Sequence, residues 1–198
     1  MIGSGRIGAA AARLFAEAGH EVWLANSRGP ASLGELPAGV EAASAAGAVA
    51  PAEVVLLALP WRRREVLPGY GPWDGKIVVD ATNPYGDAGV IDLGDDTSSE
   101  AIARELPGAR IVKAFNTMLW TRLAEEGRPG APLEDRLAMP VAGDDEEAKR
   151  IVSGLIEQIG FAPVDTGSLR EGGRRQEPGT DVYNVPITAA EARALLDA

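Results

Sequence analysis

The first eight residues, Met1-Ile2-Gly3-Ser4-Gly5-Arg6-Ile7-Gly8 (MIGSGRIG), decide how the chain folds. They contain the pattern G-x-G-x-x-G, whose glycines permit a tight turn, close approach of the backbone to a pyrophosphate, and close packing of a helix on a strand. Apolar residues recur at helical spacing from Ile7 to Ala18, and Gly19 stops that helix. The helix N-terminus presents free N–H groups to phosphates. The segment therefore predicts a dinucleotide site made of Gly3, Ser4, Gly5, Arg6, Ile7 and Gly8, with a purely structural glycine turn as the alternative.

Short apolar runs alternate with helical patterns along the rest of the chain, which is typical of an α/β fold with a mostly parallel sheet. We expect strands over residues 21–25, 54–59, 76–80 and 110–114. A weaker edge strand is expected over 137–142, because Pro140 cannot donate to a ladder. Helices are expected where capping residues begin an apolar pattern, namely at Thr97, at Asp144 and at Thr188.

The two ends of the chain have special features. Only Met1 and Ile2 precede the first glycine, so the first, central strand should be truncated and the middle of the sheet under-filled. The stretch from Gly167 to Pro186 is rich in Gly, Arg and Pro and predicts an extended arm. All 198 residues are expected to form one dinucleotide-binding domain, with a core over about 1–166 and the arm and a short helix over 167–198.

A second cofactor signal follows the second strand at Asn26-Ser27-Arg28. NAD enzymes usually carry Asp or Glu here, which accepts from the ribose 2′-hydroxyl and would repel a 2′-phosphate. In this chain a hydroxyl and a guanidinium stand where a phosphate could be held by charge-assisted hydrogen bonds. The pattern favours NADP over NAD, and the alternative is a polar turn with a solvated Arg28.

Six segments together, GSGRIG, GHEVWLANSRGP, LALPW, VVDATNPY, VKAFNT and MPVAGDDEEAKRIVSGLIEQIGF, resemble the NADP oxidoreductase family typified by the F-420-dependent NADP reductases. The resemblance covers essentially the whole chain. It implies a Rossmann-type, doubly wound fold with a short C-terminal cap, NADP(H) as cofactor, and direct hydride transfer to a second redox ligand. It also implies that Leu59, Pro60, Trp61, Asn83 and Pro84 line the nicotinamide and its ribose, and that Asn116, Thr117 and Met118 face the acceptor.

The acceptor stays open, because the arm over residues 174–180 is typical of a bacterial branch of that family. The leading hypothesis is an NADP(H)-dependent oxidoreductase that transfers hydride between NADPH and a small acceptor, either a deazaflavin (coenzyme F-420) or a flavin-like molecule. An NADPH-binding sensor or inactive paralogue is one alternative, and a small imine or carbonyl reductase is another. Hydride transfer needs alignment and exclusion of water more than an acid or base, so no catalytic residue is assigned.

Composition excludes other classes of function. The formal net charge of −10 disfavours nucleic acid as a partner. The chain has no Cys and one His, so no metal site is expected. No apolar run approaches the ~20 residues of a membrane span and no signal peptide is visible, so we expect a cytoplasmic protein without membrane contact. We also expect the protein to be a homodimer.

Three smaller features of the sequence have expected roles. The one basic run, Arg62-Arg63-Arg64, is either a solvated helix start or an attractor for an anionic tail on the acceptor. His20 and Asp80 are expected to be structural, and Phe115 is expected to pack in the core.

Overall fold

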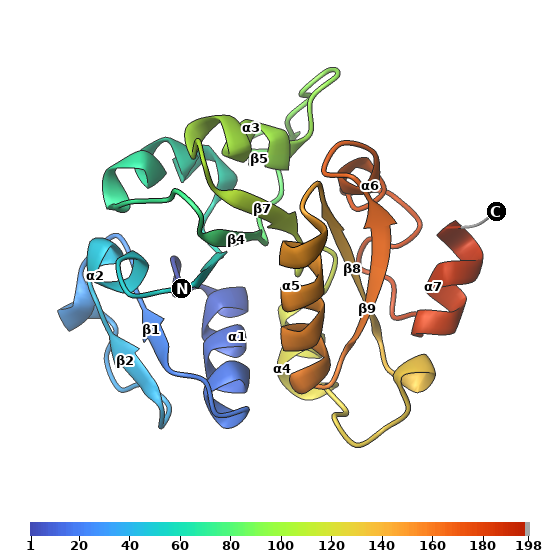
Figure 1. Ribbon diagram of the computed structural model, residues 1–198, viewed down its shortest axis with the longest axis horizontal. Helices are drawn as coiled ribbons and strands as arrows, with labels where there is room; N and C mark the ends of the chain where they lie inside the picture. The colour runs from blue at the N-terminus through green and yellow to red at the C-terminus, as the bar shows by residue number, and fades with distance from the viewer. Residues whose placement is uncertain (197–198) are drawn as a thin grey trace.

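The computed structural model describes residues 1–196 (Figure 1). Its strands are β1 (Val22–Leu24), β2 (Val40–Ala42), β3 (Val54–Leu57), β4 (Ile77–Asp80), β5 (Tyr85–Gly86), β6 (Gly89–Val90), β7 (Arg110–Lys113), β8 (Ala138–Gly143) and β9 (Ala162–Gly167). Its helices are α1 (Arg6–Glu17), α2 (Ala45–Val49), α3 (Ser98–Glu105), α4 (Trp120–Glu125), α5 (Glu146–Gln158), α6 (Glu171–Arg174) and α7 (Ala189–Leu196). Three 3-10 segments, η1 (Pro30–Ser32), η2 (Trp61–Tyr70) and η3 (Leu133–Asp135), complete the elements.

The central sheet has the order β2-β1-Ile2-β3-β4-β7-β8-β9. Ile2 joins the two parts of this sheet, because it forms parallel bridges to Ala25 and to Leu57. With the N-terminal segment counted as the first strand, the positions from β2 to β7 have the order 3-2-1-4-5-6 of dinucleotide-binding sheets. Strand β8 is antiparallel to β7 and parallel to β9. The predicted Rossmann-type, doubly wound and mostly parallel sheet is thus confirmed.

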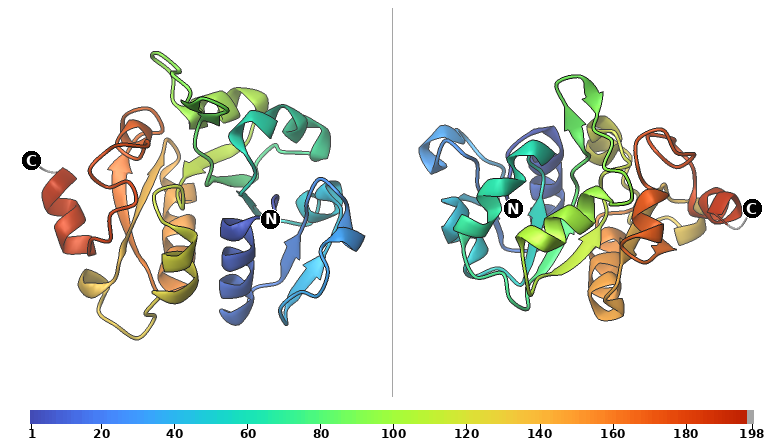
Figure 2. Two further views of the ribbon diagram at one scale, coloured as in Figure 1. Left: turned by 180° about the vertical axis from the view of Figure 1, so that it is seen from behind. Right: turned by 90° about the horizontal axis from the view of Figure 1, so that it is seen from above.

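Helices cover both faces of the sheet, as Figures 1 and 2 show. On one face α1, α4 and α5 bury a cluster that includes Phe15, Leu123 and Val152. On the other face α2, η2 and α3 bury a second cluster, to which Val49 and Ile102 belong. This layering leaves the ends of the parallel strands free of helices, and the loops that leave those ends form the candidate site.

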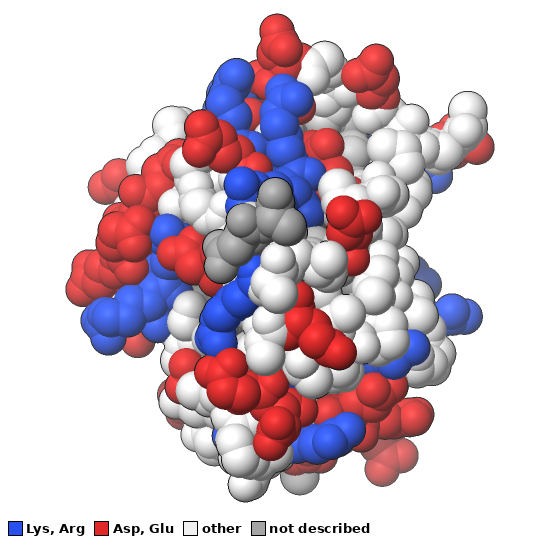
Figure 3. All heavy atoms as spheres, turned by 90° about the vertical axis from the view of Figure 1, so that its right-hand side faces the viewer, with Lys and Arg blue, Asp and Glu red and all other residues white. Residues whose placement is uncertain are grey.

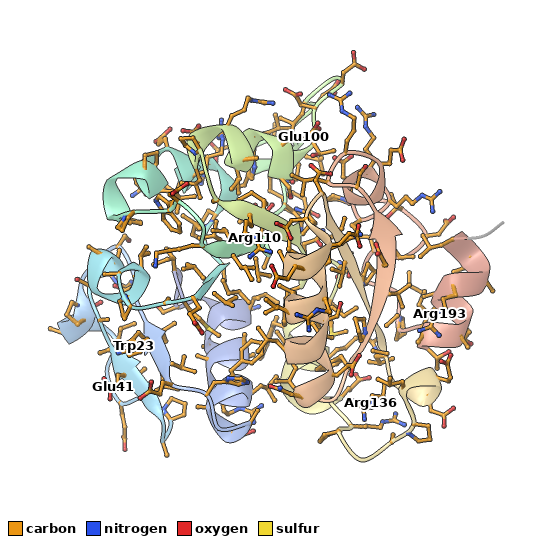
Figure 4. All side chains as sticks on the ribbon, viewed as in Figure 1. Trp23, Glu41, Glu100, Arg110, Arg136 and Arg193 are labelled. Carbon is orange, nitrogen blue, oxygen red and sulfur yellow. The ribbon has the colours of Figure 1, made fainter. Side chains whose placement is uncertain are left out.

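Local signals explain where the helices begin. The predicted capping box of α3 is present, since Thr97 accepts from the backbone N–H of Glu100 and the Glu100 side chain accepts from that of Thr97. Helix α5 is capped by Asp145 and not by Asp144, whose side chain accepts from the N–H of Leu169. Arg110 on β7 binds the Asp145 carboxylate at 2.6 Å (Figure 4) and holds the pKa of Asp145 well below its usual range.

Strand β8 corrects one expectation, because it lies inside the sheet and not at an edge. Its pairing with β7 reaches only Ala142 and Gly143, whereas Pro140 is paired with Val164 of β9. Pro140 therefore lies beyond the β7 ladder, where its missing N–H interrupts no pairing with β7. Strands β2 and β9 were not predicted at all.

The segment before Pro186 corrects a second expectation, because it is not extended. It contains α6 and a series of turns, and it folds back over the end of the sheet (Figure 1). The Gln176 side chain is fully buried and donates to Thr166 at 2.8 Å. The segment predicted as an extended arm is thus a folded segment packed against the core.

The middle of the sheet is under-filled, as the short first strand predicted. The Met1 amine donates to the Trp23 carbonyl at 2.5 Å, and the Ile2 N–H donates to the Leu56 carbonyl at 2.9 Å. Beside Met1 lies a cavity of about 550 Å³, and its apolar lining comes from α1, β1, β3 and α5. Two residues therefore bridge β1 and β3 at one end of the sheet, and a hollow separates those strands at the other end.

Candidate functional site

The glycine loop has the shape that a dinucleotide site requires. Gly3 has a φ of +111°, and a Cβ there would lie 2.3 Å from the Ala58 carbonyl oxygen. A Cβ on Gly8 would lie 1.9 Å from the Gly3 carbonyl oxygen. Gly5, by contrast, has nothing within 4 Å of its Cβ position, and no side chain caps the N-terminus of α1. The two packed glycines fix the turn, and the open one leaves room for a phosphate.

Asn26 connects this loop to the turn after β1. Its amide nitrogen lies 3.2 Å from Ser4 Oγ and 2.9 Å from Ser32 Oγ, and its carbonyl oxygen accepts from the N–H of Arg28 at 2.9 Å. Ser27 and Arg28 are exposed at the tip of the turn. Asn26 thus orders the turn, and the hydroxyl and guanidinium beside it remain available to a ligand.

A pair of amides lies where β4 and β7 end. Asn83 donates to the Asn116 carbonyl at 3.0 Å, and the Asn116 side chain donates to Asn83 Oδ1 at 3.1 Å. Phe115, with a φ of 68°, packs in the core as expected. A non-glycine residue in this conformation persists only where its surroundings hold it, and such residues cluster at functional sites. The turn sends Phe115 inward and Asn116 toward Asn83.

The folded-back segment covers this pair. Asn116 also donates to the Gln176 carbonyl at 2.8 Å, and the Asn184 N–H donates to the Thr117 carbonyl at 2.8 Å. Asn116, Thr117 and Met118, assigned to the acceptor by the sequence, are all buried. Only the oxygen Asn116 Oδ1 among their polar side-chain atoms is both buried and without a hydrogen-bond partner in the described part of the chain.

Two tyrosines belong to the site and were not predicted. Tyr183 Oη lies 3.3 Å from Asn83 Nδ2 and 3.0 Å from Tyr85 Oη. Burial and the hydrogen bond to Tyr85 raise the pKa of Tyr183 above its usual range, so its hydroxyl stays neutral. Tyr85 ends the segment VVDATNPY but had no assigned role, and Tyr183 lies in none of the quoted segments. The contact between the β5–β6 hairpin and the C-terminal segment brings the two together.

A buried ion pair supports the amide pair from below. Lys113 and Asp80 end the adjacent strands β7 and β4, and Lys113 Nζ lies 3.2 Å from Asp80 Oδ2. The same ammonium donates to the Thr82 carbonyl at 2.6 Å, one residue before Asn83. Asp80 accepts from the Thr82 N–H and from Ser99, so it is the structural anchor that the sequence predicted.

The three residues predicted after β3, Leu59, Pro60 and Trp61, differ in their burial and in what they contact. Leu59 lies against the glycine loop, because a Cβ on Gly3 would be 2.9 Å from its nitrogen, and Pro60 is exposed. Trp61, however, is turned into the core, where its indole N–H donates to the Ser98 carbonyl. The structure therefore gives Trp61 a packing role. Pro84 is likewise buried behind Asn83.

The basic run after β3 is largely neutralised. Arg62 is paired with Asp87, and Arg64 lies 3.7 Å from Glu105 and stacks over the Trp61 ring. His20 lies at the other end of α1, where it contacts Gln158 at 2.6 Å. In residues 1–196 no group of three or more His, Cys, Asp or Glu side chains is arranged to hold a metal, and no helix is long and apolar enough to cross a membrane.

Comparison with known proteins gives these features a context. A family model described as "NADP oxidoreductase coenzyme F420-dependent" matches residues 1–84, which hold the glycine loop and Asn83. The "hypothetical protein SMa0349" of Sinorhizobium meliloti has a crystal structure that is 37% identical with a TM-score of 0.85, over 94% of this chain and 93% of that one. A "putative f420 dependent nadp-reductase" from Arthrobacter sp. FB24 is 27% identical with a TM-score of 0.73, over 99% and 88% of the two chains.

A curated relative matches a shorter stretch. Metalloreductase STEAP3 of Rattus norvegicus is 33% identical over 96 residues, which are 48% of this chain and 18% of that protein. The chain therefore corresponds to less than a fifth of the metalloreductase. The match to the Sinorhizobium meliloti protein, by contrast, runs almost from end to end. Taken with the glycine loop and the strand order, these matches show that the chain belongs to the family of NADP-dependent oxidoreductases described as coenzyme F420-dependent.

Proposed function

We propose that this protein transfers a hydride between NADPH and a small flavin-like or deazaflavin acceptor at the carboxyl ends of β3, β4 and β7. The observation that carries the proposal is the amide pair Asn83–Asn116, which lies beyond the strand ends on the glycine-loop side of a doubly wound sheet. Ligands of such sheets bind outside the carboxyl ends of the strands.

The residues of the first part of the sheet fit NADP(H). Gly5 leaves open space at the uncapped N-terminus of α1, which suits the pyrophosphate. Ser27 and Arg28 are exposed at the end of β1 without a carboxylate among their neighbours in the turn, which suits a 2′-phosphate. When bound there, NADPH supplies one proton and two electrons as hydride to the acceptor, which takes up a second proton from solvent.

The chain's own residues bind, orient and exclude water. The amides of Asn83 and Asn116 offer fixed polar groups beside the glycine loop, and the segment around Gln176 shields them from solvent. Asn116 Oδ1, buried and unpaired, is the acceptor atom available to a donor on a bound ring. Alignment of this kind, and not an acid or base, is what hydride transfer requires.

Isotope transfer tests the proposal. NADPH deuterated on the transferred face is mixed with the protein and with F-420, FMN, FAD or a cyclic imine in separate reactions. With F-420 we expect the label to stay on the ring carbon C5 of the reduced deazaflavin. A reduced flavin carries the transferred hydrogen on the nitrogen N5, where it exchanges with water, so transfer to FMN or FAD is measured as a primary isotope effect on NADPH oxidation. Label found in water in the F-420 or imine reaction, or the absence of an isotope effect with a flavin, contradicts direct transfer. Transfer only to the imine establishes the imine reductase alternative. NADPH binding without turnover on any acceptor establishes the sensor.

A further inference from the structure

Arg6 stands apart from the rest of the glycine loop. It is exposed, and no ion pair involving it occurs among residues 1–196. Its guanidinium lies 5.2 Å from the centroid of the Trp120 ring, which is a cation–π distance. The sequence assigned Arg6 to the cofactor with the other loop residues, yet its charged group faces α4.

The surface beside Arg6 is apolar and exposed. Trp120 is 38% exposed, and the adjacent Leu119 is 43% exposed. Val185, 44% exposed, lines one small pocket together with Leu119 and Thr117. Large apolar side chains that are exposed together, with polar groups at their rim, are typical of a binding surface.

The apolar surface of Leu119, Trp120 and Val185 lies close to the amide pair Asn83–Asn116. Trp120 follows Asn116 by four residues, and the Asn184 N–H bonds to the Thr117 carbonyl, which brings Val185 to the same place. Arg6 begins α1, directly after the loop that suits the pyrophosphate. The surface therefore borders the cofactor loop on one side and the buried end of β7 on the other.

No other described feature serves an anionic, aromatic ligand as well. In the basic run, Arg62 and Arg64 are paired with carboxylates, and the exposed Arg63 has no cation–π contact with a ring among the described residues. The cavity of about 550 Å³ beside Met1 and His20 is lined mainly by apolar side chains, and its charged lining residues are the acids Glu21 and Glu53, which would repel an anion. Within residues 1–196, only Arg6 and Trp120 bring an unpaired cation into cation–π contact with an exposed ring.

We infer that the side chains of Arg6, Leu119 and Trp120 form the acceptor subsite. The ring system of the acceptor packs on Trp120 and Leu119, and the guanidinium of Arg6 binds an anionic group on its tail. The inference rests on the proposed function, and it specifies the substrate as a planar aromatic redox molecule that carries a phosphate or carboxylate. Charge-assisted hydrogen bonds of this kind are stronger than neutral ones.

Two pairs of probes separate the tail from the ring. FMN and riboflavin share one ring and differ in the phosphate, and F-420 and the deazaflavin nucleoside without its tail form the matching pair. Dissociation constants are measured by ring fluorescence in the presence of NADP⁺, which cannot donate a hydride. We expect Arg6→Gln to weaken FMN and F-420 about tenfold and to leave the two tail-less probes unchanged. Trp120→Leu should weaken all four probes about tenfold, and Trp120→Phe should restore most of the loss.

Controls and contrary outcomes are distinct. Arg150→Gln removes an equally exposed charge on α5 and should change no dissociation constant. The subsite is overturned if Arg6→Gln weakens tailed and tail-less probes equally, or if Arg6→Gln weakens the binding of NADP⁺ and leaves the binding of FMN unchanged. It is also overturned if the wild-type protein binds none of the four probes. Binding without hydride transfer from NADPH defeats the proposed function and leaves the subsite standing. Transfer that is unaffected by both substitutions defeats the subsite and leaves the function standing.

Discussion

Lys113 is a charged residue that the core accommodates because three polar groups contact its ammonium. It is 1% exposed, and its ammonium contacts the Asp80 carboxylate, the Thr82 carbonyl and the Ser98 hydroxyl. Taking such a pair out of water is costly, so the pair adds little net stability. Removal of one partner, however, leaves the other charge buried without a partner, which is strongly destabilising. The pair joins β4 to β7 immediately below Asn83.

Lys113→Met should therefore destabilise the protein by about 3–5 kcal/mol, because Asp80 would be left buried without its cation. Urea unfolding followed by circular dichroism measures the loss. The double variant Lys113→Met with Asp80→Leu should recover much of it, since neither charge then remains. A single variant as stable as the wild type would show that the pair is not desolvated as its burial indicates.

Arg28 is predicted to choose between the two nicotinamide cofactors. Arg28→Ala should raise the KM for NADPH at least about tenfold, because a charge-assisted hydrogen bond contributes roughly 1.5–3 kcal/mol. The KM for NADH should hardly change, since NADH has no 2′-phosphate. Steady-state kinetics with both cofactors measure the effect, and Arg150→Ala on α5 is the control for loss of an exposed charge. Equal responses to NADPH and NADH would show that Arg28 does not contact the phosphate.

At the scale of elements, the capping box of α3 links a local sequence signal to stability. Thr97→Ala removes the oxygen that accepts from the Glu100 N–H and should cost about 1 kcal/mol. For a chain of this size the melting temperature should fall by about 2–4 °C. Thr97→Ser keeps the oxygen and should lose less, and Thr121→Ala on the exposed side of α4 is the control. Equal melting temperatures for Thr97→Ala and Thr97→Ser would exclude the cap as the source.

Elements with local signals could be predicted from the sequence, and elements that depend on distant partners could not. The Thr97 and Glu100 pair, the stop at Gly19 and the apolar runs of β3 and β4 each specify structure within a few residues. Strand β2 has three residues and β9 contains Pro163, so neither has an apolar run or alternation long enough to predict a strand. Both exist because a neighbouring strand pairs with them.

The same distinction applies to the candidate site. The glycine loop and the residues Asn26, Arg28, Asn83 and Asn116 were found from motifs or from a family resemblance. Tyr183 reaches Asn83 across 100 positions of sequence, and Arg6 reaches Trp120 from another element. A contact of this kind is set by the folded-back C-terminal segment and the packing of α1 against α4, for which the sequence has no local signal.

At the scale of the whole molecule, the chain carries a formal net charge of −10. On the face that carries α7, acidic and basic side chains are interspersed (Figure 3), as in the pair of Arg193 with Glu134. One titratable group with a shifted pKa, the Met1 amine, lies in the middle of the sheet. Burial lowers the pKa of this amine from 8.0 to about 5.

This amine should make stability depend on pH in a chain that begins at Met1. Between pH 5 and pH 8 the unfolded chain binds a proton that the folded chain does not, so the free energy of unfolding should rise with pH across this window. Melting temperatures at several pH values measure the slope. Acetylation of the amine removes the proton site and should flatten the curve. The same slope after acetylation would assign the dependence to other groups.

The cavity beside Met1 leads to the last prediction. Val22 and Trp23 on one side and Val54 and Leu56 on the other line a hollow of about 550 Å³ between β1 and β3. A central parallel strand normally has about five or six residues and is buried on both faces. Addition of six apolar, β-branched residues before Met1 should let the chain pair with both strands and fill this space.

Such an extension should raise the melting temperature by several degrees, because about 2–4 °C corresponds to each kcal/mol gained. An extension of six Gly and Ser residues is the matched control, since it displaces the amine equally and fills little of the cavity. Both extensions should flatten the pH dependence, because both remove the Met1 amine from the sheet. Only the apolar extension should stabilise the fold at pH 8. An apolar extension that leaves the melting temperature unchanged or lower would show that β1 and β3 cannot accept a strand between them.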